Sequence, residues 1–197
     1  MLVSFLRDHR SLPEIVSVGK TTRITVANDM VDTRIFLEGS PHPSGKLKIG
    51  EFCSIATRAS FFLGGNHNTK RITTWLPSYD SYDISQELKT NGDIIIEDDV
   101  WIGMGAVIMS GATIRTGSVV GAYSVVSGSF EPYSIIAGNP GRVVRKRFDD
   151  RKIEILLKSK WWTWDLDFIN QNRHIVFSED FSLFEDLVSS LDNDKSF

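Results

Sequence analysis

The sequence has little cysteine, little net charge and no long apolar run, and each shortage excludes a class of protein. Its 197 residues contain one cysteine, Cys53, so a disulfide framework within the chain is impossible and a reducing cytoplasm is expected. The net charge of −3 gives no electrostatic reason to expect nucleic-acid binding. No stretch approaches the ~18 apolar residues of a membrane span, and the first residues lack the basic leader and long apolar region of a secretory signal. We therefore expect a soluble, cytoplasmic protein.

What the sequence does contain is a period of six. From Ile96, hexapeptides follow one another in one register for 36 residues. Neither a helix, with its period near 3.6, nor a half-buried strand, with its period of 2, explains this spacing. A solenoid does, because each short flat strand with one corner contributes one large and one small inward residue. The first place of the repeat is always Ile or Val, and the fifth is mostly small: Ile96, Ile102, Ile108, Ile114, Val120 and Val126 against Val100, Ala106, Ala112, Ser118, Ser124 and Phe130.

Three such sides make one coil of about 18 residues, so the repeats predict two turns of a triangular prism. Two further hexapeptides of the same form lie upstream, at Ile49–Ser54 and Ile55–Ser60. From Ile55 to Ile96 is 41 residues, which is not a multiple of six. Residues 64–93 are therefore predicted to leave the repeats as an excursion. A loop on a rigid scaffold is a usual place for chemistry.

The chain divides into three predicted parts. Residues 1–46 are interpreted as irregular N-terminal coils, residues 47–144 as the β-helix with its excursion, and residues 145–197 as a C-terminal helical cap. In the last part, apolar spacing predicts helices over 149–159 and 181–191, with a tryptophan-rich segment, 161–164, after the first. We interpret these aromatic residues as packing, because an uncovered last coil would expose its core and strand edges.

Four motifs occur in order: Gly64-Gly-Asn-His67, Asp98-Asp-Val-Trp-Ile-Gly103, Val120-Gly-Ala-Tyr-Ser-Val-Val126 and Ile136-Ala-Gly-Asn-Pro-Gly-Arg142. Together they resemble the left-handed β-helix acyltransferases, and more narrowly the xenobiotic acetyltransferase branch. That branch includes type B chloramphenicol and streptogramin acetyltransferases and relatives that act on carbohydrates. The resemblance covers roughly residues 47–165. It implies an all-β left-handed parallel β-helix, an acetyl-CoA-dependent acyltransferase, and a homotrimer with one active site at each subunit interface.

His67 is the candidate general base. Acetyl transfer to a hydroxyl needs a base for the hydroxyl proton, donors for the tetrahedral oxyanion and a slot for the pantetheine arm. An imidazole can take that proton and later hand one to the CoA thiolate; a solvated loop histidine is the alternative interpretation. Because no Cys or Ser stands in a nucleophile setting beside a His, we expect direct transfer in a ternary complex. Backbone amides near Gly103 or across the interface are expected to hold the oxyanion.

Small residues on the coils would let the pantetheine arm lie along the backbone, and basic residues after them would meet the CoA phosphates. The plainer interpretations are tight solenoid corners and a solvated charge cluster. The predicted acetyl-CoA contacts are Gly103, Ala106, Gly121, Ala122, Ser124, Asn139, Pro140, Arg142, Arg145 and Lys146, with Arg147 in the same basic run. The predicted acceptor contacts are Asn66, Trp75, Tyr79 and Trp101. The aromatic side chains among them suit sugars and polycyclic drugs alike, so they do not decide the acceptor class.

Several functions fit these motifs. The leading hypothesis is O-acetylation of a carbohydrate-type acceptor, followed by an antibiotic acetyltransferase and an amino-sugar N-acetyltransferase. In place of the Ser-Thr-x-Pro-Phe type segment of the drug-modifying members, this chain has Thr73-Thr-Trp-Leu-Pro77, which puts an inherited drug specificity in doubt. A γ-carbonic anhydrase needs three histidines on the coils, and residues 94–144 contain none, so no metal is expected. A non-catalytic assembly scaffold is the remaining alternative.

Overall fold

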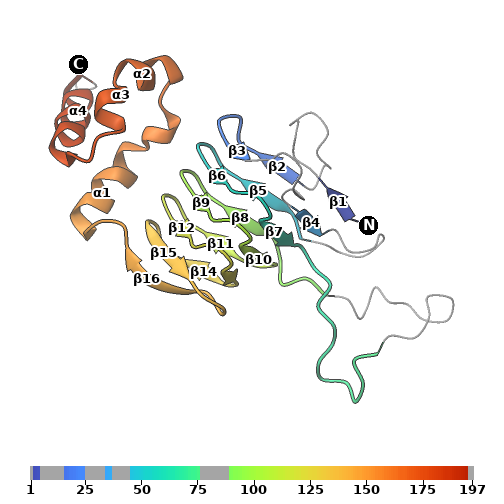
Figure 1. Cartoon of the computed structure of the whole chain (residues 1–197). Coiled ribbons are helices and arrows are strands. Elements are labelled where there is room, and N and C mark those ends of the chain that lie inside the picture. Colours follow the sequence, from blue (N-terminus) through green and yellow to red (C-terminus); the bar gives the residue numbers. More distant parts are fainter. Residues whose placement is uncertain (1, 5–15, 25–33, 37–44, 76–88, 195–197) are drawn as a thin grey trace. The chain divides into compact units, whose positions relative to one another are not determined.

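The computed structural model describes residues 2–4, 16–24, 34–36, 45–75 and 89–194 (Figure 1). The chain forms two compact units, residues 1–147 and residues 148–197. The first unit is a parallel β-solenoid and the second is helical. Each unit is described by itself below.

The described strands of the first unit form three sheets, here called A, B and C. Sheet A contains β1 (Leu2–Ser4), β4 (Arg34–Phe36), β7 (Ser60–Phe62), β10 (Val107–Met109) and β13 (Val125–Val126). Sheet B contains β2 (Val16–Val18), β5 (Leu47–Ile49), β8 (Ile94–Ile96), β11 (Thr113–Ile114) and β14 (Ser129–Phe130). Sheet C contains β3 (Arg23–Ile24), β6 (Ser54–Ile55), β9 (Trp101–Ile102), β12 (Val119–Val120), β15 (Ser134–Ala137) and β16 (Arg142–Lys146).

From β2 to β13 the chain visits the sheets in the order B, C, A, so it turns through three kinds of corner; the last coil has β14 in sheet B and both β15 and β16 in sheet C. We call the three kinds the BC corner (residues 50–53, 97–100, 115–118 and 131–133), the CA corner (56–59, 103–106 and 121–124) and the AB corner (63–93, 110–112 and 127–128). Residues 138–141 join β15 to β16 within sheet C, but they lie beside Val125 at the end of the CA corner and are counted with it. The pairing between coils is parallel, whereas β1 and β16 pair antiparallel with β4 and β15 at the two ends. The period-six pattern is therefore explained by one strand and one corner per hexapeptide.

The pairing of the strands gives the number of residues that the excursion adds to its coil. Ile108 pairs with Val126, 18 residues later, which is one uninterrupted coil. Ile55 pairs with Ile102, 47 residues later, so this coil carries 29 additional residues. They leave the solenoid at the AB corner after β7 and return before β8, as Figure 1 shows for the parts on either side of residues 76–88.

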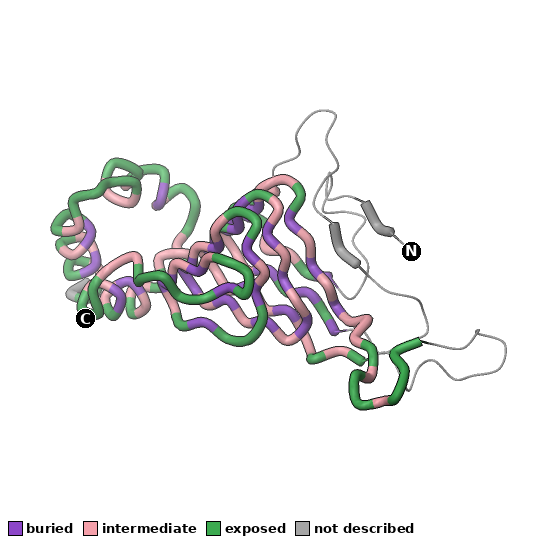
Figure 2. The backbone as a smooth tube through the Cα atoms, turned by 60° about the horizontal axis from the view of Figure 1, so that its bottom comes forward, coloured by how far each residue is buried: buried purple, intermediate pink, exposed green. Residues whose placement is uncertain are grey.

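The core of the solenoid is built from the first and fifth places of the repeat, as predicted. Figure 2 shows buried positions recurring along the coils. Every first-place side chain from Ile96 to Val126 is buried, and so is every fifth-place side chain from Val100 to Ser124. Each fully buried aliphatic side chain contributes roughly 1.5–3 kcal/mol of transfer free energy. Phe130, the exception in the pattern, has a structural reason. The last AB corner is short, so Phe130 pairs with Ile114 and fills a large inward place rather than a small one.

The N-terminal strands continue the solenoid in register. Val16–Val18 pairs in parallel with Leu47–Ile49, and Arg23–Ile24 pairs with Ser54–Ile55. At the connecting corner the Glu51 carboxylate accepts hydrogen bonds from Thr21 N at 2.9 Å and Thr21 Oγ1 at 2.6 Å. These segments were predicted only as irregular early coils, because their repeats lack the regular aliphatic spacing seen after Ile96.

The helical unit contains α1 (Asp150–Ser159), a 3₁₀ turn (Trp161–Thr163), α2 (Leu166–Gln171), α3 (Arg173–Val176) and α4 (Phe181–Asp194). The two helices predicted over 149–159 and 181–191 correspond to α1 and α4. Trp164 stacks on Phe184 at 5.8 Å between ring centroids and meets Phe168 edge-on at 5.4 Å. The aromatic residues therefore pack within this unit. None of the helices in the described residues is long and apolar enough to cross a membrane.

Candidate functional site

The root of the excursion is fixed to the solenoid at the AB corner. Asn66 and Lys89 exchange two backbone hydrogen bonds, of 3.0 and 2.9 Å, across the two ends of the excursion. Thr90 Oγ1 donates to the Leu63 carbonyl at 2.7 Å. The buried Ser110 hydroxyl, on the neighbouring coil, accepts from Asn66 Nδ2 at 3.3 Å and from the Asn91 amide at 3.2 Å. His67 follows directly on this fixed root.

His67 is exposed, and its ring is oriented by the loop itself. Its Nδ1 lies 3.0 Å from the carbonyl oxygen of Thr74. A carbonyl oxygen only accepts, so Nδ1 carries the hydrogen in this contact and Nε2 of the neutral ring keeps a free lone pair. This is the tautomer that a general base needs, because Nε2 can then take a proton from an acceptor hydroxyl. The sequence could not name this partner, since a main-chain carbonyl has no side-chain signature.

The predicted acetyl-CoA contacts gather at the CA corner. Gly103 and Ala106, then Gly121, Ala122 and Ser124, then Asn139 and Pro140 occupy the same corner of successive coils. Hydrogen bonds connect these layers, including Gly121 N to the Ile136 carbonyl at 2.8 Å and Gly138 N to Ser124 Oγ at 3.1 Å. Ala106 and Ser124 are buried in the coil, so their side chains face the core and only their backbone could reach a ligand.

The structure does not support an oxyanion contact from the Gly103 amide. That N–H already donates to the Val120 carbonyl at 2.8 Å. Gly103 is also tightly enclosed, because a Cβ there would lie 2.6 Å from Ala122 N. The expectation of an oxyanion contact from other amides near Gly103, or from across the interface, stays a prediction. In a solenoid corner the smallness of Gly103 serves close contact between coils.

The predicted phosphate contacts separate into two groups. Arg142, Arg145 and Lys146 all lie on β16 and are exposed. Arg147 behaves differently, because its Nη1 donates to Asp99 Oδ2 at 3.1 Å and to the Gly117 carbonyl at 2.6 Å. Its guanidinium also lies 5.4 Å from the ring centroid of the buried Tyr133. Arg147 therefore fixes the BC corner.

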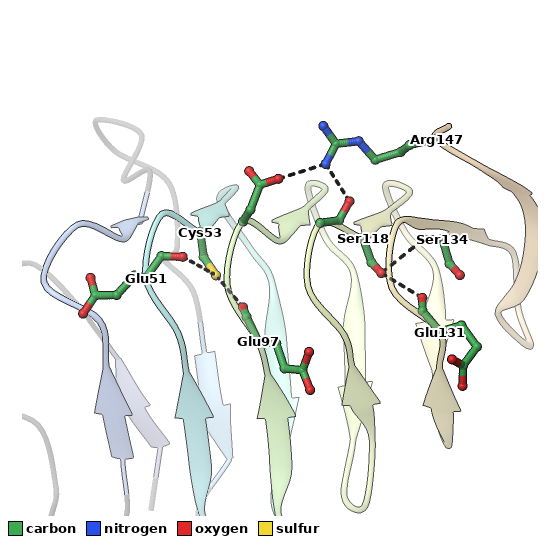
Figure 3. Close-up of polar contacts among 9 residues, drawn as sticks. Glu51, Cys53, Glu97, Ser118, Glu131, Ser134 and Arg147 are labelled. Carbon is green, nitrogen blue, oxygen red and sulfur yellow. Dashed lines mark hydrogen bonds and ion pairs between the residues drawn. The ribbon is translucent and has the colours of Figure 1, made fainter. Parts of the chain in front are cut away.

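Figure 3 shows the BC corner as a polar ladder that runs along the coils. The Cys53 thiol donates to the Glu97 carbonyl at 3.0 Å, and burial raises the pKa of this thiol to about 12. Burial also raises the pKa of the Asp99 carboxyl, although the nearby Arg147 opposes that shift. Ser118 Oγ accepts from the Ser134 amide and donates to the Glu131 carbonyl, both at 3.3 Å. Cys53 and Ser118 bond within the wall and Asp99 bonds to Arg147, so these contacts stabilise the corner.

The predicted acceptor contacts that lie in the described residues are found on different elements of the chain. Trp75 is 70% exposed on the excursion, and Trp101 is 55% exposed on the outer face of sheet C, beside Ser54 and Val119. The Asn66 side chain donates a hydrogen bond to Ser110, and Tyr79 lies outside the described residues. The other described histidine, His174, lies on α3 in the helical unit.

Two exposed side chains at the CA corner were missed. Tyr123 has a φ of 56°, and its ring covers Gly105. Its hydroxyl lies 3.8 Å from the Met104 sulfur. Both residues occupy places of the repeat that are free in the pattern, so the period carried no signal for them. They border the predicted acetyl-CoA contacts.

The predicted acetyl-CoA contacts lie at the corner before the strands of sheet A, and the loop that carries His67 leaves at the corner after them. Strand β10 (Val107–Met109) connects Ala106 at the CA corner to Ser110 at the AB corner. Four residues of extended chain span about 13 Å. One subunit therefore presents the candidate base at one corner and the candidate cofactor contacts at another. Within the described residues, no three His, Cys, Asp or Glu side chains come together as a metal site.

Comparisons with known proteins identify relatives of this chain in sequence and in fold. Residues 93–128 match the bacterial transferase hexapeptide family, described by six repeats. A probable macrolide acetyltransferase from Lysinibacillus sphaericus is 41% identical over 143 residues, which is 68% of this chain and 78% of that protein. A chloramphenicol acetyltransferase from Agrobacterium fabrum is 41% identical over 126 residues, 60% of either chain.

Among solved structures, a hexapeptide-repeat acetyltransferase from Vibrio cholerae in complex with acetyl coenzyme A is similar. It has a TM-score of 0.51 and 29% identity, over 69% of this chain and 62% of that one. The left-handed parallel β-helix and the acyltransferase class predicted from the sequence are confirmed by these relatives. The chain belongs to the hexapeptide-repeat acetyltransferases.

Proposed function

We propose that this protein transfers the acetyl group of acetyl-CoA directly to a hydroxyl of a carbohydrate-type acceptor, with His67 as general base. The observation that carries the proposal is the contact of His67 Nδ1 with the Thr74 carbonyl, which leaves Nε2 available for a proton. Nε2 takes the acceptor's hydroxyl proton as the oxygen attacks the thioester carbonyl. The carbon–sulfur bond then breaks, and the CoA thiolate leaves and receives that proton from His67.

Acetyl-CoA binding is supported by the CA corner and by β16. Small residues of successive coils leave a surface where a thin pantetheine arm can approach the backbone, and Arg142, Arg145 and Lys146 extend exposed positive charge from the same end of the solenoid. The exposed Met104 and Tyr123 add apolar area beside this track. The acetyl-CoA complex of the Vibrio cholerae relative supports the same co-substrate.

Self-association would bring His67 of one copy close to the predicted acetyl-CoA contacts of another. In one chain sheet A separates His67 from the CA corner, so a complete site needs a second copy that brings its CA corner to the His67 loop. The exposed Trp101 and the outward Val119 and Val125 on sheets C and A offer apolar surface for such contacts. We therefore propose a homotrimer with a site at each interface. Sedimentation velocity should give three chains per particle, and a monomer with full turnover would contradict this arrangement. The single buried cysteine supports a cytoplasmic location.

The second candidate acceptor is an antibiotic. It is favoured by the names of the relatives, a probable macrolide acetyltransferase and a chloramphenicol acetyltransferase, each 41% identical. Trp75, exposed on the same loop as His67, offers an aromatic face to either acceptor class.

CoA-thiol release from acetyl-CoA, measured with a panel of acceptors, tests the proposal. The panel contains simple sugars, nucleotide-linked amino sugars, chloramphenicol, a macrolide and a streptogramin A. We expect turnover with a sugar hydroxyl. Turnover with the drugs alone would replace the carbohydrate acceptor by the antibiotic one, and acetylation at an amino group would make the protein an N-acetyltransferase. Failure to bind acetyl-CoA would contradict every one of these transferase functions and favour a non-catalytic assembly scaffold.

A further inference from the structure

Ser110 stands where the excursion meets the solenoid. It occupies the third, free place of its hexapeptide, a place that the repeat does not require to be inward, yet it is only 3% exposed. Its hydroxyl oxygen accepts two hydrogen bonds, one from Asn66 Nδ2 at 3.3 Å and one from the Asn91 amide at 3.2 Å. A hydroxyl oxygen has two lone pairs, so both are used by the excursion.

The two donors belong to the two ends of the excursion. Asn66 lies on the outgoing end, immediately before His67, and Asn91 lies on the returning end. The same ends are joined to each other by the backbone pair between Asn66 and Lys89. Ser110 thus connects this pair to β10, whose Ile108 side chain is fully buried in the core.

We infer that Ser110 is a positioning residue for His67, acting through the Asn66 side chain. The inference rests on the proposed function, since it assigns Ser110 a role in placing the proposed base. The Thr74 contact orients the imidazole within the loop, but loop and ring would move together if the root were free. The bond to Ser110 fixes that root against the rigid coil. Asn66, predicted from the sequence to contact the acceptor, is thereby reassigned to holding the loop.

The test compares Ser110→Ala with Ser118→Ala. Both serines are buried, occupy corners of neighbouring hexapeptides and form two hydrogen bonds, but Ser118 bonds only to the Ser134 amide and the Glu131 carbonyl within the BC corner. Turnover is measured with acetyl-CoA and the acceptor that reacts fastest in the panel above. Amide hydrogen exchange of peptides containing Asn66 and Lys89 reports the loop root without any acceptor.

We expect Ser110→Ala to lower kcat by roughly tenfold or more, because a small misplacement of a catalytic group is costly. The KM for acetyl-CoA should change less than about twofold, since the CA corner lies at the opposite end of the strands of sheet A. Exchange at Asn66 and Lys89 should accelerate. Ser118→Ala should leave kcat and this exchange unchanged. Ser110→Thr, which keeps the hydroxyl, should retain most of kcat.

Two results would overturn the inference: an unchanged kcat in Ser110→Ala, whether or not exchange accelerates, or equal losses of kcat in the two alanine variants. If Ser110→Ala does not fold, Asn66→Ala removes the same hydrogen bond by deleting its donor. It should likewise lower kcat and leave the KM for acetyl-CoA nearly unchanged. The double variant should be no worse than the more affected single variant, because both changes break one interaction. Full turnover in His67→Ala would refute the proposed base instead, while the exchange result would still report the root.

Discussion

The AB and BC corners begin from the same repeat and end in opposite roles. At the BC corner, Arg147 follows directly after β16, lies over Tyr133 and bonds to Asp99, and the other polar groups bond within the corner. At the AB corner, 29 residues are inserted after β7, and the polar groups of the wall bond outward to them. The first corner therefore stabilises the solenoid, and the second fixes a loop that carries His67.

This difference shows how a repetitive fold can hold a site without losing its core. The excursion changes neither the register of the strands on either side nor the burial of the inward residues. The insertion is confined to one corner and needs only a few bonds at its root. Changes at the BC corner should therefore affect folding, and changes at the AB corner should affect turnover.

The sharpest way to separate the corners uses two glycines at the fourth place of neighbouring hexapeptides. Gly117 and Gly111 have φ values of +73° and +79°, so alanine is equally strained at both. A Cβ on Gly117 would lie 2.3 Å from the ring of Tyr133, which is buried under Arg147. We expect Gly117→Ala to lower the free energy of unfolding by about 2–4 kcal/mol, combining left-handed strain and overpacking.

A Cβ on Gly111 would instead lie 2.6 Å from the Asn91 carbonyl, in the returning end of the excursion. Gly111→Ala should displace that end, lower kcat by roughly tenfold, and cost about 1–2 kcal/mol of stability from backbone strain. Chemical denaturation and steady-state kinetics measure both effects. The comparison fails if Gly117→Ala reduces kcat of the folded protein as much as Gly111→Ala does.

A smaller effect concerns Arg147 and pH. Burial raises the pKa of Asp99 and Arg147 counteracts it, so Arg147→Gln should raise that pKa further. A folded state that holds a proton more tightly than the unfolded chain loses stability as the pH rises through this window. The variant should lose about 1–2 kcal/mol at pH 7.5 and less at pH 4.5. Urea unfolding at the two pH values measures this, and a loss independent of pH would mean that Asp99 is not the group involved.

The smallest expected effect is at Cys53. Its thiol is buried at the BC corner and its pKa is raised to about 12, so almost no thiolate exists near neutral pH. The native protein should not react with a chromogenic disulfide reagent at pH 8, whereas the urea-unfolded chain should react at one thiol per chain. Rapid labelling of the native protein would show that this corner opens.

The fold was largely predictable because a solenoid repeats one local rule. The Ile or Val of each first place is buried, so a single pattern located strands β8 to β13. The pattern failed at Phe130, where a short corner shifts the register by two residues. It was also weak before residue 47, where paired positions such as Val16 and Leu47 are 31 residues apart in the sequence and not 18, although the strands still pair in parallel.

The candidate site was predictable only in part. His67 was predicted because it lies in a glycine-flanked excursion, and the cofactor contacts were predicted from small and basic residue types; both stay predictions. The Thr74 carbonyl could not be found, since every residue has one. Ser110 carries no motif either, because a serine at a free place becomes meaningful only when the fold brings Asn66 and Asn91 to it. Arg147 was grouped with its basic neighbours, although its partners, Asp99 and the Gly117 carbonyl, lie in other coils.

The central claim is that His67 is the general base, and His67→Ala tests it most directly beside His174→Ala, a change at the exposed histidine of the helical unit. Acetyl-CoA affinity is measured by calorimetry and turnover by CoA-thiol release. We predict that His67→Ala keeps its fold and its affinity for acetyl-CoA but loses about 10²–10⁴-fold in kcat, whereas His174→Ala is unchanged. Full turnover in His67→Ala, or an equal loss in both variants, would contradict the account.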